Sequence, residues 1–162
     1  YQVERLCLMD EPLTALSEGF FSQREYLLSE NQRAHPRFRY AYQFSQAERV
    51  VVAAPFWDLS FPALLKIYIE NVCVDGITFG ANERGTYGLC KAKRLLLLTT
   101  RGGDYHDSPL EMGARYLEAL CDFWGIPRFD VVAADSLDLG QEAVNVILDR
   151  AIANAIKLAD RF

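Results

Sequence analysis

The chain has 162 residues, of which 51% are hydrophobic and 24% charged, a composition typical of one folded domain and not of a disordered segment. Its 22 acidic and 17 basic residues give a formal net charge of −5, which argues against nucleic acid or an anionic membrane as the partner. No apolar stretch approaches the roughly 20 residues of a transmembrane helix, and no signal-peptide pattern is present. The four cysteines are far apart, which favours reduced thiols in a cytoplasmic protein over a zinc site or disulfides.

Short apolar runs alternate with amphipathic stretches along the chain. The run QVERLCL predicts a strand over residues 2–8. Residues 19–33 predict a helix, and a weaker helical stretch follows Pro36. The uninterrupted run RVVVAA predicts a buried parallel strand over residues 49–54.

The middle of the chain repeats this alternation. Ser60 is expected to cap a helix that has Pro62 in its first turn. The segment GANERGTYGLCKA, residues 80–92, is rich in glycine and polar residues and predicts a surface excursion. The run RLLLLTT then predicts a second buried strand over residues 94–100.

The last third contains one more strand between two helices. Ser108, Pro109 and Glu111 predict a capping box for a helix over residues 110–124. The run FDVVAA predicts a third buried strand over residues 129–134. The C-terminal helix is expected to bury Val144, Ile147, Ala151, Ile152 and Ala155. Strands that alternate with helices indicate crossover units on a parallel sheet, so we expect a single α/β domain over residues 1–162.

Two loops follow the carboxyl ends of the predicted strands, where open parallel sheets bind their ligands. They are PFWDLSFP, residues 55–62, and TRGGDYHDSP, residues 100–109. Gly102 and Gly103 leave the backbone accessible to a ligand or an anion, although a tight turn alone also explains them.

The side chains on these loops each allow two interpretations. Phe56 and Trp57 either line a flat aromatic ligand or pack beneath the loop. His106 either contacts a substrate or lies in solvent. Its neighbours Asp104 and Asp107 fit turns and caps better than acid–base catalysis.

The chain contains none of the common sequence motifs of other nucleotide-binding, metal or nucleophile sites. The dinucleotide fingerprint, the P-loop, the H-E-x-x-H zinc motif and the G-x-S-x-G nucleophile motif are all absent from the sequence. A nucleophile pair of His106 with Cys121 stays open, although chance spacing explains it better. We therefore predict no metal and no acid–base residue.

Taken together, the segments VVAAPFWDLSFPALLKIYIENVCVDGITF and LLLLTTRGGDYHDSP resemble the FMN-dependent NADH:quinone oxidoreductases and azoreductases of flavodoxin-like fold. In that family A-A-P with an aromatic pair ends the third strand, G-[IV]-T-F follows the next helix, and [ST]-R-G-G ends the fourth strand. FWGI at residues 123–126 is similar to the family's helix end before the fifth strand. The resemblance covers about residues 48–135 and implies a doubly wound parallel sheet with helices on both faces.

The resemblance also implies an activity and a set of site residues. Two electrons would pass from NADH or NADPH through FMN to a quinone or azo compound in a ping-pong reaction, within a homodimer. The implied cofactor-binding residues are Pro55, Phe56, Trp57, Asp58, Leu59, Thr100, Arg101, Gly102 and Gly103. The implied substrate pocket contains Tyr105, His106, Phe79 and Phe123.

The sequence departs from the family pattern in two places. Asp58 stands where the family commonly has asparagine, and a carboxylate there is expected to weaken FMN binding or to lower the flavin potential. QVERLCL matches the family's second strand, so the first strand and the FMN-phosphate loop are expected to be missing from these residues, and the start at Tyr1 favours a longer protein. The alternative function is a flavodoxin-fold protein that has lost FMN and serves as a binding or assembly module.

Overall fold

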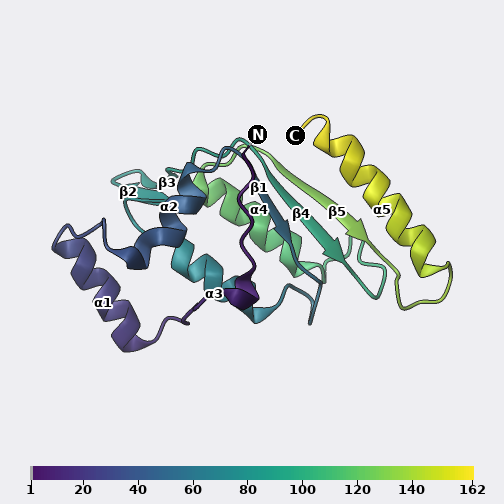
Figure 1. Cartoon of the computed structure of the whole chain (residues 1–162), viewed down its shortest axis with the longest axis horizontal. Helices are drawn as coiled ribbons and strands as arrows, with labels where there is room; N and C mark the ends of the chain where they lie inside the picture. The colour runs from purple at the N-terminus through teal and green to yellow at the C-terminus, as the bar shows by residue number, and fades with distance from the viewer. Residues whose placement is uncertain (1) are drawn as a thin grey trace.

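The computed structural model describes residues 2–162 as an α/β structure with a small separate hairpin (Figure 1). The first half of the chain forms η1 (Leu8–Asp10), α1 (Glu18–Ser29), η2 (Pro36–Phe38), α2 (Arg39–Gln46), β1 (Val50–Ala53) and α3 (Ala63–Val72). The second half forms β2 (Phe79–Asn82), β3 (Gly85–Gly88), β4 (Leu95–Thr100), α4 (Met112–Trp124), β5 (Phe129–Ala134) and α5 (Val144–Ala159).

The main sheet is parallel, with its strands in the order β1-β4-β5. Val50 is paired with Leu95, and Leu95 is paired in turn with Phe129, so the three strands start level with one another. The predicted strands over 49–54, 94–100 and 129–134 are therefore confirmed. Parallel strands need crossover connections, and α3 and α4 occur within the crossovers from β1 to β4 and from β4 to β5.

The hydrophobic core lies between the sheet and helices α2, α3 and α4. From α4, Leu117, Cys121 and Trp124 are buried, because their spacing of four and three residues puts them on one face of the helix. They pack in one cluster with the strand residues Leu95 and Leu97. This core fixes the orientation of α4, and with it the position of the helix's amino end at the edge of the sheet.

The surface excursion predicted for residues 80–92 is a β-hairpin instead. Strands β2 and β3 pair antiparallel, with Phe79 opposite Gly88. Gly88 lies against the backbone of Trp124 and Gly125 at the carboxyl end of α4, and a Cβ at position 88 would overlap those atoms. Gly85 has a φ of +118°, which favours glycine at the turn of the hairpin.

The strand predicted over residues 2–8 is wrong. Residues 2–7 have no regular structure, and η1 follows at Leu8. The apolar alternation is real, since Leu6 and Leu8 pack against the main core. A strand also needs a hydrogen-bonding neighbour, however, and among residues 2–162 the only strand paired with β1 is β4.

Both predicted helix caps lie outside the helices they were expected to start. The helix after Ser60 begins at Ala63 with Pro62 at its N-cap, because Ser60 is hydrogen-bonded to Trp57 in a turn. The helix predicted from residue 110 begins at Met112, and its N-cap is Glu111, whose carboxylate accepts the N–H of Ala114.

Several apolar side chains of β1 and α5 are exposed. Val51 on β1 is 53% exposed, and on α5 Ile152 and Ile156 are 56% and 61% exposed. Of the residues predicted to be buried on α5, Ile147 is buried and Ala151 and Ala155 are half-buried, whereas Val144 and Ile152 are exposed. None of the helices formed by residues 2–162 has both the length and the apolar character that a bilayer crossing requires.

We predict that Gly88→Ala lowers the free energy of unfolding by roughly 1–3 kcal/mol, because the added Cβ forces the hairpin away from α4. Gly19→Ala is the matched control, since a Cβ at position 19 meets open space in the first turn of α1. The control is expected to gain about 0.5 kcal/mol. Urea denaturation measures both, and equal effects would show that the hairpin does not depend on this contact.

Candidate functional site

Backbone hydrogen bonds continue past the ends of the three parallel strands and hold their following loops side by side. The N–H of Phe56, after β1, donates to the carbonyl of Thr100 at the end of β4 over 2.9 Å. The N–H of Arg101, after β4, donates to the carbonyl of Ala134 at the end of β5 over 2.9 Å. The two loops singled out in the sequence therefore meet at one edge of the sheet.

The loop after β1 turns sharply between Trp57 and Ser60. Each of these residues donates its N–H to the carbonyl of the other, and both distances are 2.9 Å. The two residues between them have left-handed backbones, with a φ of +50° at Asp58 and +68° at Leu59. Asp tolerates this conformation, whereas a leucine there is strained. The turn leaves the Trp57 side chain 61% exposed beside the edge of the sheet.

The two aromatic residues that follow β1 have different environments. The Phe56 ring packs 4.6 Å from the Tyr105 ring and lies 5.6 Å from the Arg101 guanidinium carbon. Phe56 thus joins the loop after β1 to the loop after β4, as the packing interpretation expected. The Trp57 side chain is more exposed than that of Phe56, so Trp57 is the better candidate to contact a ligand.

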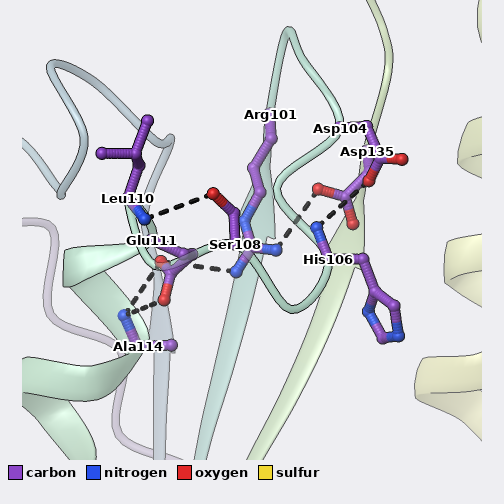
Figure 2. A network of polar contacts seen from close by, with 8 residues as sticks. All are labelled: Arg101, Asp104, His106, Ser108, Leu110, Glu111, Ala114 and Asp135. Carbon is purple, nitrogen blue, oxygen red and sulfur yellow. Dashed lines mark hydrogen bonds and ion pairs between the residues drawn. The ribbon is translucent and has the colours of Figure 1, made fainter.

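Arg101 lies inside the protein and forms ion pairs with two acidic residues (Figure 2). Its side chain is 5% exposed. Nη2 lies 3.4 Å from Oε1 of Glu111, the N-cap of α4, and Nη1 lies 3.2 Å from Oδ1 of Asp135, just after β5. The guanidinium that the family pattern placed among the cofactor-binding groups is therefore occupied by protein carboxylates.

The Gly102–Gly103 segment is bound on one side by the loop after β5. The Gly102 carbonyl accepts the N–H of Asp138 over 2.9 Å, and the Gly103 carbonyl accepts the N–H of Ser136 over 3.0 Å. A Cβ at Gly102 would overlap the Asp138 carboxylate, and one at Gly103 would lie 3.0 Å from the Tyr105 ring. A Cβ at either position would therefore require a neighbouring side chain to move.

The structure does not bring Phe79 and Phe123 to this edge within one chain. The two rings pack against each other 4.4 Å apart, where the hairpin meets the carboxyl half of α4. Met112, at the other end of α4, contacts the site loop by donating its N–H to the Leu59 carbonyl. At about 1.5 Å per residue, Phe123 lies roughly 16 Å from Met112 along the helix.

His106 lies next to Asp104 in the loop after β4, with its side chain in solvent (Figure 2). Its side chain is 81% exposed and lies 3.5 Å from the Asp107 carboxylate. Asp104 accepts the backbone N–H of His106 over 3.1 Å, which is the turn-forming role expected for it. Cys121 is buried on α4, so it forms no nucleophile pair with His106.

Burial raises the pKa of Cys121 and of Cys90 to about 12, with acidic neighbours contributing at Cys121 and the other thiols at Cys90. Neither thiol is a thiolate at neutral pH, so neither serves as a nucleophile. Residues 2–162 contain no group of three or more His, Cys, Asp and Glu side chains placed to hold a metal ion.

Comparison with known proteins places the chain in a family. The family model described as "Flavodoxin-like fold" matches residues 1–159. An FMN-dependent NADH:quinone oxidoreductase of Caldicellulosiruptor saccharolyticus is 37% identical over 164 residues, which cover 99% of this chain and 82% of the relative. The chain belongs to the flavodoxin-like FMN-dependent NADH:quinone oxidoreductases. The family predicted from the A-A-P and T-R-G-G loops is thereby confirmed.

Other relatives agree with this placement of the flavodoxin-like chain. The FMN-dependent NADH:quinone oxidoreductase 2 of Clostridium acetobutylicum is 46% identical over 131 residues, which cover 79% of this chain and 66% of the relative. The chain thus spans about two thirds of the length of that relative. The crystal structure of an azoreductase from Bacillus anthracis has a TM-score of 0.85 at 26% identity, covering 97% of this chain and 80% of that one.

The flavodoxin-like chain offers unpaired donors that fit the edge of a flavin ring. Within residues 2–162, the N–H groups of Asp58, Leu59, Gly102 and Gly103 donate to no backbone or side-chain acceptor. They come from the two loops that the Phe56–Thr100 hydrogen bond holds together. The ring of FMN presents carbonyl oxygens and nitrogens along one edge, so these donors match its chemistry. The N–H groups of Phe56 and Trp57 are already used within the protein and are not available to it.

Sequence reasoning missed the loop after β5, which supplies Asp135, Ser136 and Asp138 to the site. The signal was present, because a third buried parallel strand was predicted at 129–134 and its carboxyl end must meet the same edge of the sheet. Glu111 was assigned only a capping role, and its ion pair with Arg101 had no local signal in the sequence.

We predict that Leu59→Asn stabilises the protein by about 0.5–1 kcal/mol, because asparagine adopts the left-handed backbone with less strain than leucine. Leu110→Asn is the control, since Leu110 is 53% exposed and is not among the residues with positive φ. Urea denaturation of the two variants measures the difference. A destabilised Leu59→Asn would mean that the Leu59 side chain contributes more than its backbone strain costs.

Proposed function

We propose that this chain performs FMN-dependent oxidoreduction, passing two electrons from NADH or NADPH to quinones or azo compounds by a ping-pong mechanism. The observation that carries the proposal is the set of four unpaired N–H groups at Asp58, Leu59, Gly102 and Gly103, on the two loops that the family pattern assigns to the flavin. The names and similarity of the relatives support the same activity.

FMN, when bound, supplies the chemistry by accepting a hydride from the nicotinamide and giving two electrons to the acceptor. The chain's own residues bind and orient the flavin. The N–H groups of Gly102 and Gly103 share peptide planes with the carbonyls of Arg101 and Gly102, which accept the N–H groups of Leu137 and Asp138, so the donors are fixed before the ligand arrives. Fixed donors stabilise the negative charge that reduction places on the ring without a reorganisation cost. The exposed Trp57 side chain offers a flat apolar surface beside them.

A non-catalytic binding module is the second candidate, and two carboxylates favour it. Asp58 places an exposed carboxylate in the turn that would face the flavin. Glu111 occupies the amino end of α4, which excludes a phosphate group from that helix end. The phosphate of FMN therefore needs a binding group other than α4.

The test is a titration of the purified protein with FMN, followed by visible absorption. We expect a bound-flavin band that NADH bleaches and a quinone restores, and we expect Asp58→Asn to bind FMN about fivefold tighter. Asparagine keeps the left-handed turn and removes the charge next to the flavin.

Asp75→Asn is the matched control, since it removes an exposed carboxylate in the segment between α3 and β2, away from the site loops. It is expected to leave the FMN affinity unchanged. A protein that retains no flavin absorption after separation from millimolar free FMN would reject the oxidoreductase in favour of the binding module. Equal effects of the two substitutions would place the flavin elsewhere.

We also propose that the chain functions as a cytoplasmic homodimer. Four cysteines, all free, suit a reducing compartment. An apolar patch borders the site and consists of Trp57, Leu59, Leu110 and Met112, exposed by 61%, 39%, 53% and 48%. The N–H of Met112 donates to the Leu59 carbonyl over 3.0 Å, so α4 and the turn present this patch as one surface. Contiguous exposed apolar surface is typical of interfaces.

We predict that Met112→Glu converts the dimer to a monomer, raising its dissociation constant by about 100-fold or more, because an unpaired carboxylate is buried at the interface. Ile156→Glu is the control, since Ile156 is 61% exposed on α5, away from the patch. Sedimentation velocity over a concentration series measures both. A wild-type monomer would contradict the homodimer, and loss of the dimer only in Ile156→Glu would place the interface on α5.

A further inference from the structure

The guanidinium of Arg101 joins the loops that follow all three parallel strands (Figure 2). It bridges Glu111 at the start of α4 and Asp135 after β5, and it lies 5.6 Å from the centre of the Phe56 ring after β1. Its own backbone is fixed as well, because its N–H donates to Ala134 and its carbonyl accepts the N–H of Leu137 over 3.1 Å.

Arg101 pairs with two carboxylates, and each of them belongs to a different part of the site. Glu111 is 7% exposed, and both of its oxygens accept the N–H of Ala114 at 3.0 Å, which ties it to the first turn of α4. Asp135 has a side chain 22% exposed and begins the loop whose residues Ser136 and Asp138 bind the carbonyls of Gly103 and Gly102. The guanidinium therefore connects α4 to that loop across the glycine segment.

We propose that Arg101 is a positioning residue that fixes the free N–H groups of Gly102 and Gly103 for the flavin through Glu111 and Asp135, and that it does not bind the flavin itself. The assignment rests on the proposed function, because the flavin is the group these donors would meet. The geometry carries it: both terminal nitrogens are directed at protein carboxylates, and the side chain is 5% exposed. Lysine cannot replace this arrangement, because one ammonium does not span two carboxylates with planar, separated donors.

The experiment compares Asp135→Asn, Arg101→Lys and Arg101→Met with the wild type, and uses Arg115→Met as the matched control. Arg115 is an exposed arginine of α4 whose Nη1 contacts the Pro109 carbonyl and the Met112 sulfur. Amide hydrogen exchange of Arg101, Leu137 and Asp138, whose N–H groups are hydrogen-bonded around the glycine segment, is measured first on protein without FMN. FMN affinity and the midpoint potential of the bound flavin are measured next.

We expect exchange at Leu137 and Asp138, whose N–H groups bind the carbonyls of Arg101 and Gly102, to rise about tenfold in Asp135→Asn and more in Arg101→Met, with FMN dissociation constants rising by about the same factor. The midpoint potential is expected to fall, because loosening the donors removes more stabilisation from the negatively charged reduced ring than from the oxidised ring. Arg101→Lys is expected to lie between the wild type and Arg101→Met, and Arg115→Met is expected to match the wild type.

Two results would overturn the assignment. Weaker FMN binding in Arg101→Met with unchanged exchange would make Arg101 a direct ligand. Unchanged exchange and affinity in Asp135→Asn would show that the Arg101–Asp135 ion pair does not position the glycine loop. If Arg101→Met does not fold, Asp135→Asn and Arg101→Lys decide the question, since both keep a hydrogen-bonding group at the altered position. A wild type that binds no FMN would reject the proposed function, while the exchange measurement would still test the positioning of the glycine loop.

Discussion

Parallel backbone pairing between β1, β4 and β5 is the constraint on which the site depends. The strands start level, and their hydrogen bonding continues into the loops through the Phe56–Thr100 and Arg101–Ala134 contacts. Loops that are far apart in sequence are thereby held in adjacent positions by main-chain groups, whatever side chains they carry. Side chains then determine what this edge can bind, and they do so through charge and through the backbone donors they leave free.

Charge at this edge is distributed in a way that distinguishes a flavin ring from a phosphate. Glu111 neutralises the amino end of α4 and pairs with Nη2 of Arg101, whose Nη1 pairs with Asp135, while Nε is buried without a hydrogen-bond partner among residues 2–162. Neutral N–H groups remain as the accessible donors on the loops after β1 and β4. The described residues are thus suited to the polar edge of a ring.

Much of this arrangement was predictable because buried parallel strands have a strong sequence signal. RVVVAA, RLLLLTT and FDVVAA each became a strand within one residue of the expected bounds, and the loops after the first two carry the site. QVERLCL failed because strand formation requires a partner that periodicity cannot supply. Ser108 is not the cap because α4 begins at Met112 with Glu111 as its N-cap, and the Ser108 hydroxyl accepts the N–H of Leu110 instead. Arg101 and Asp135 are 34 residues apart, so no local pattern reveals their ion pair.

The weak attachment of α5 has a consequence for how the protein opens. Only Ile147 of its 16 residues is buried, whereas the loop between β5 and α5 is fixed to β4 by Ser136, Leu137 and Asp138. Local unfolding follows such differences in contact density, so α5 detaches at a lower free energy than the rest of the chain unfolds. The point at which α5 would separate comes after Asp138 in the chain, C-terminal to the residues whose hydrogen bonds hold the glycine loop. Fraying of the C-terminal helix therefore leaves these hydrogen bonds in place but removes Asn154, which lines the same cavity as Arg101 and Asp135.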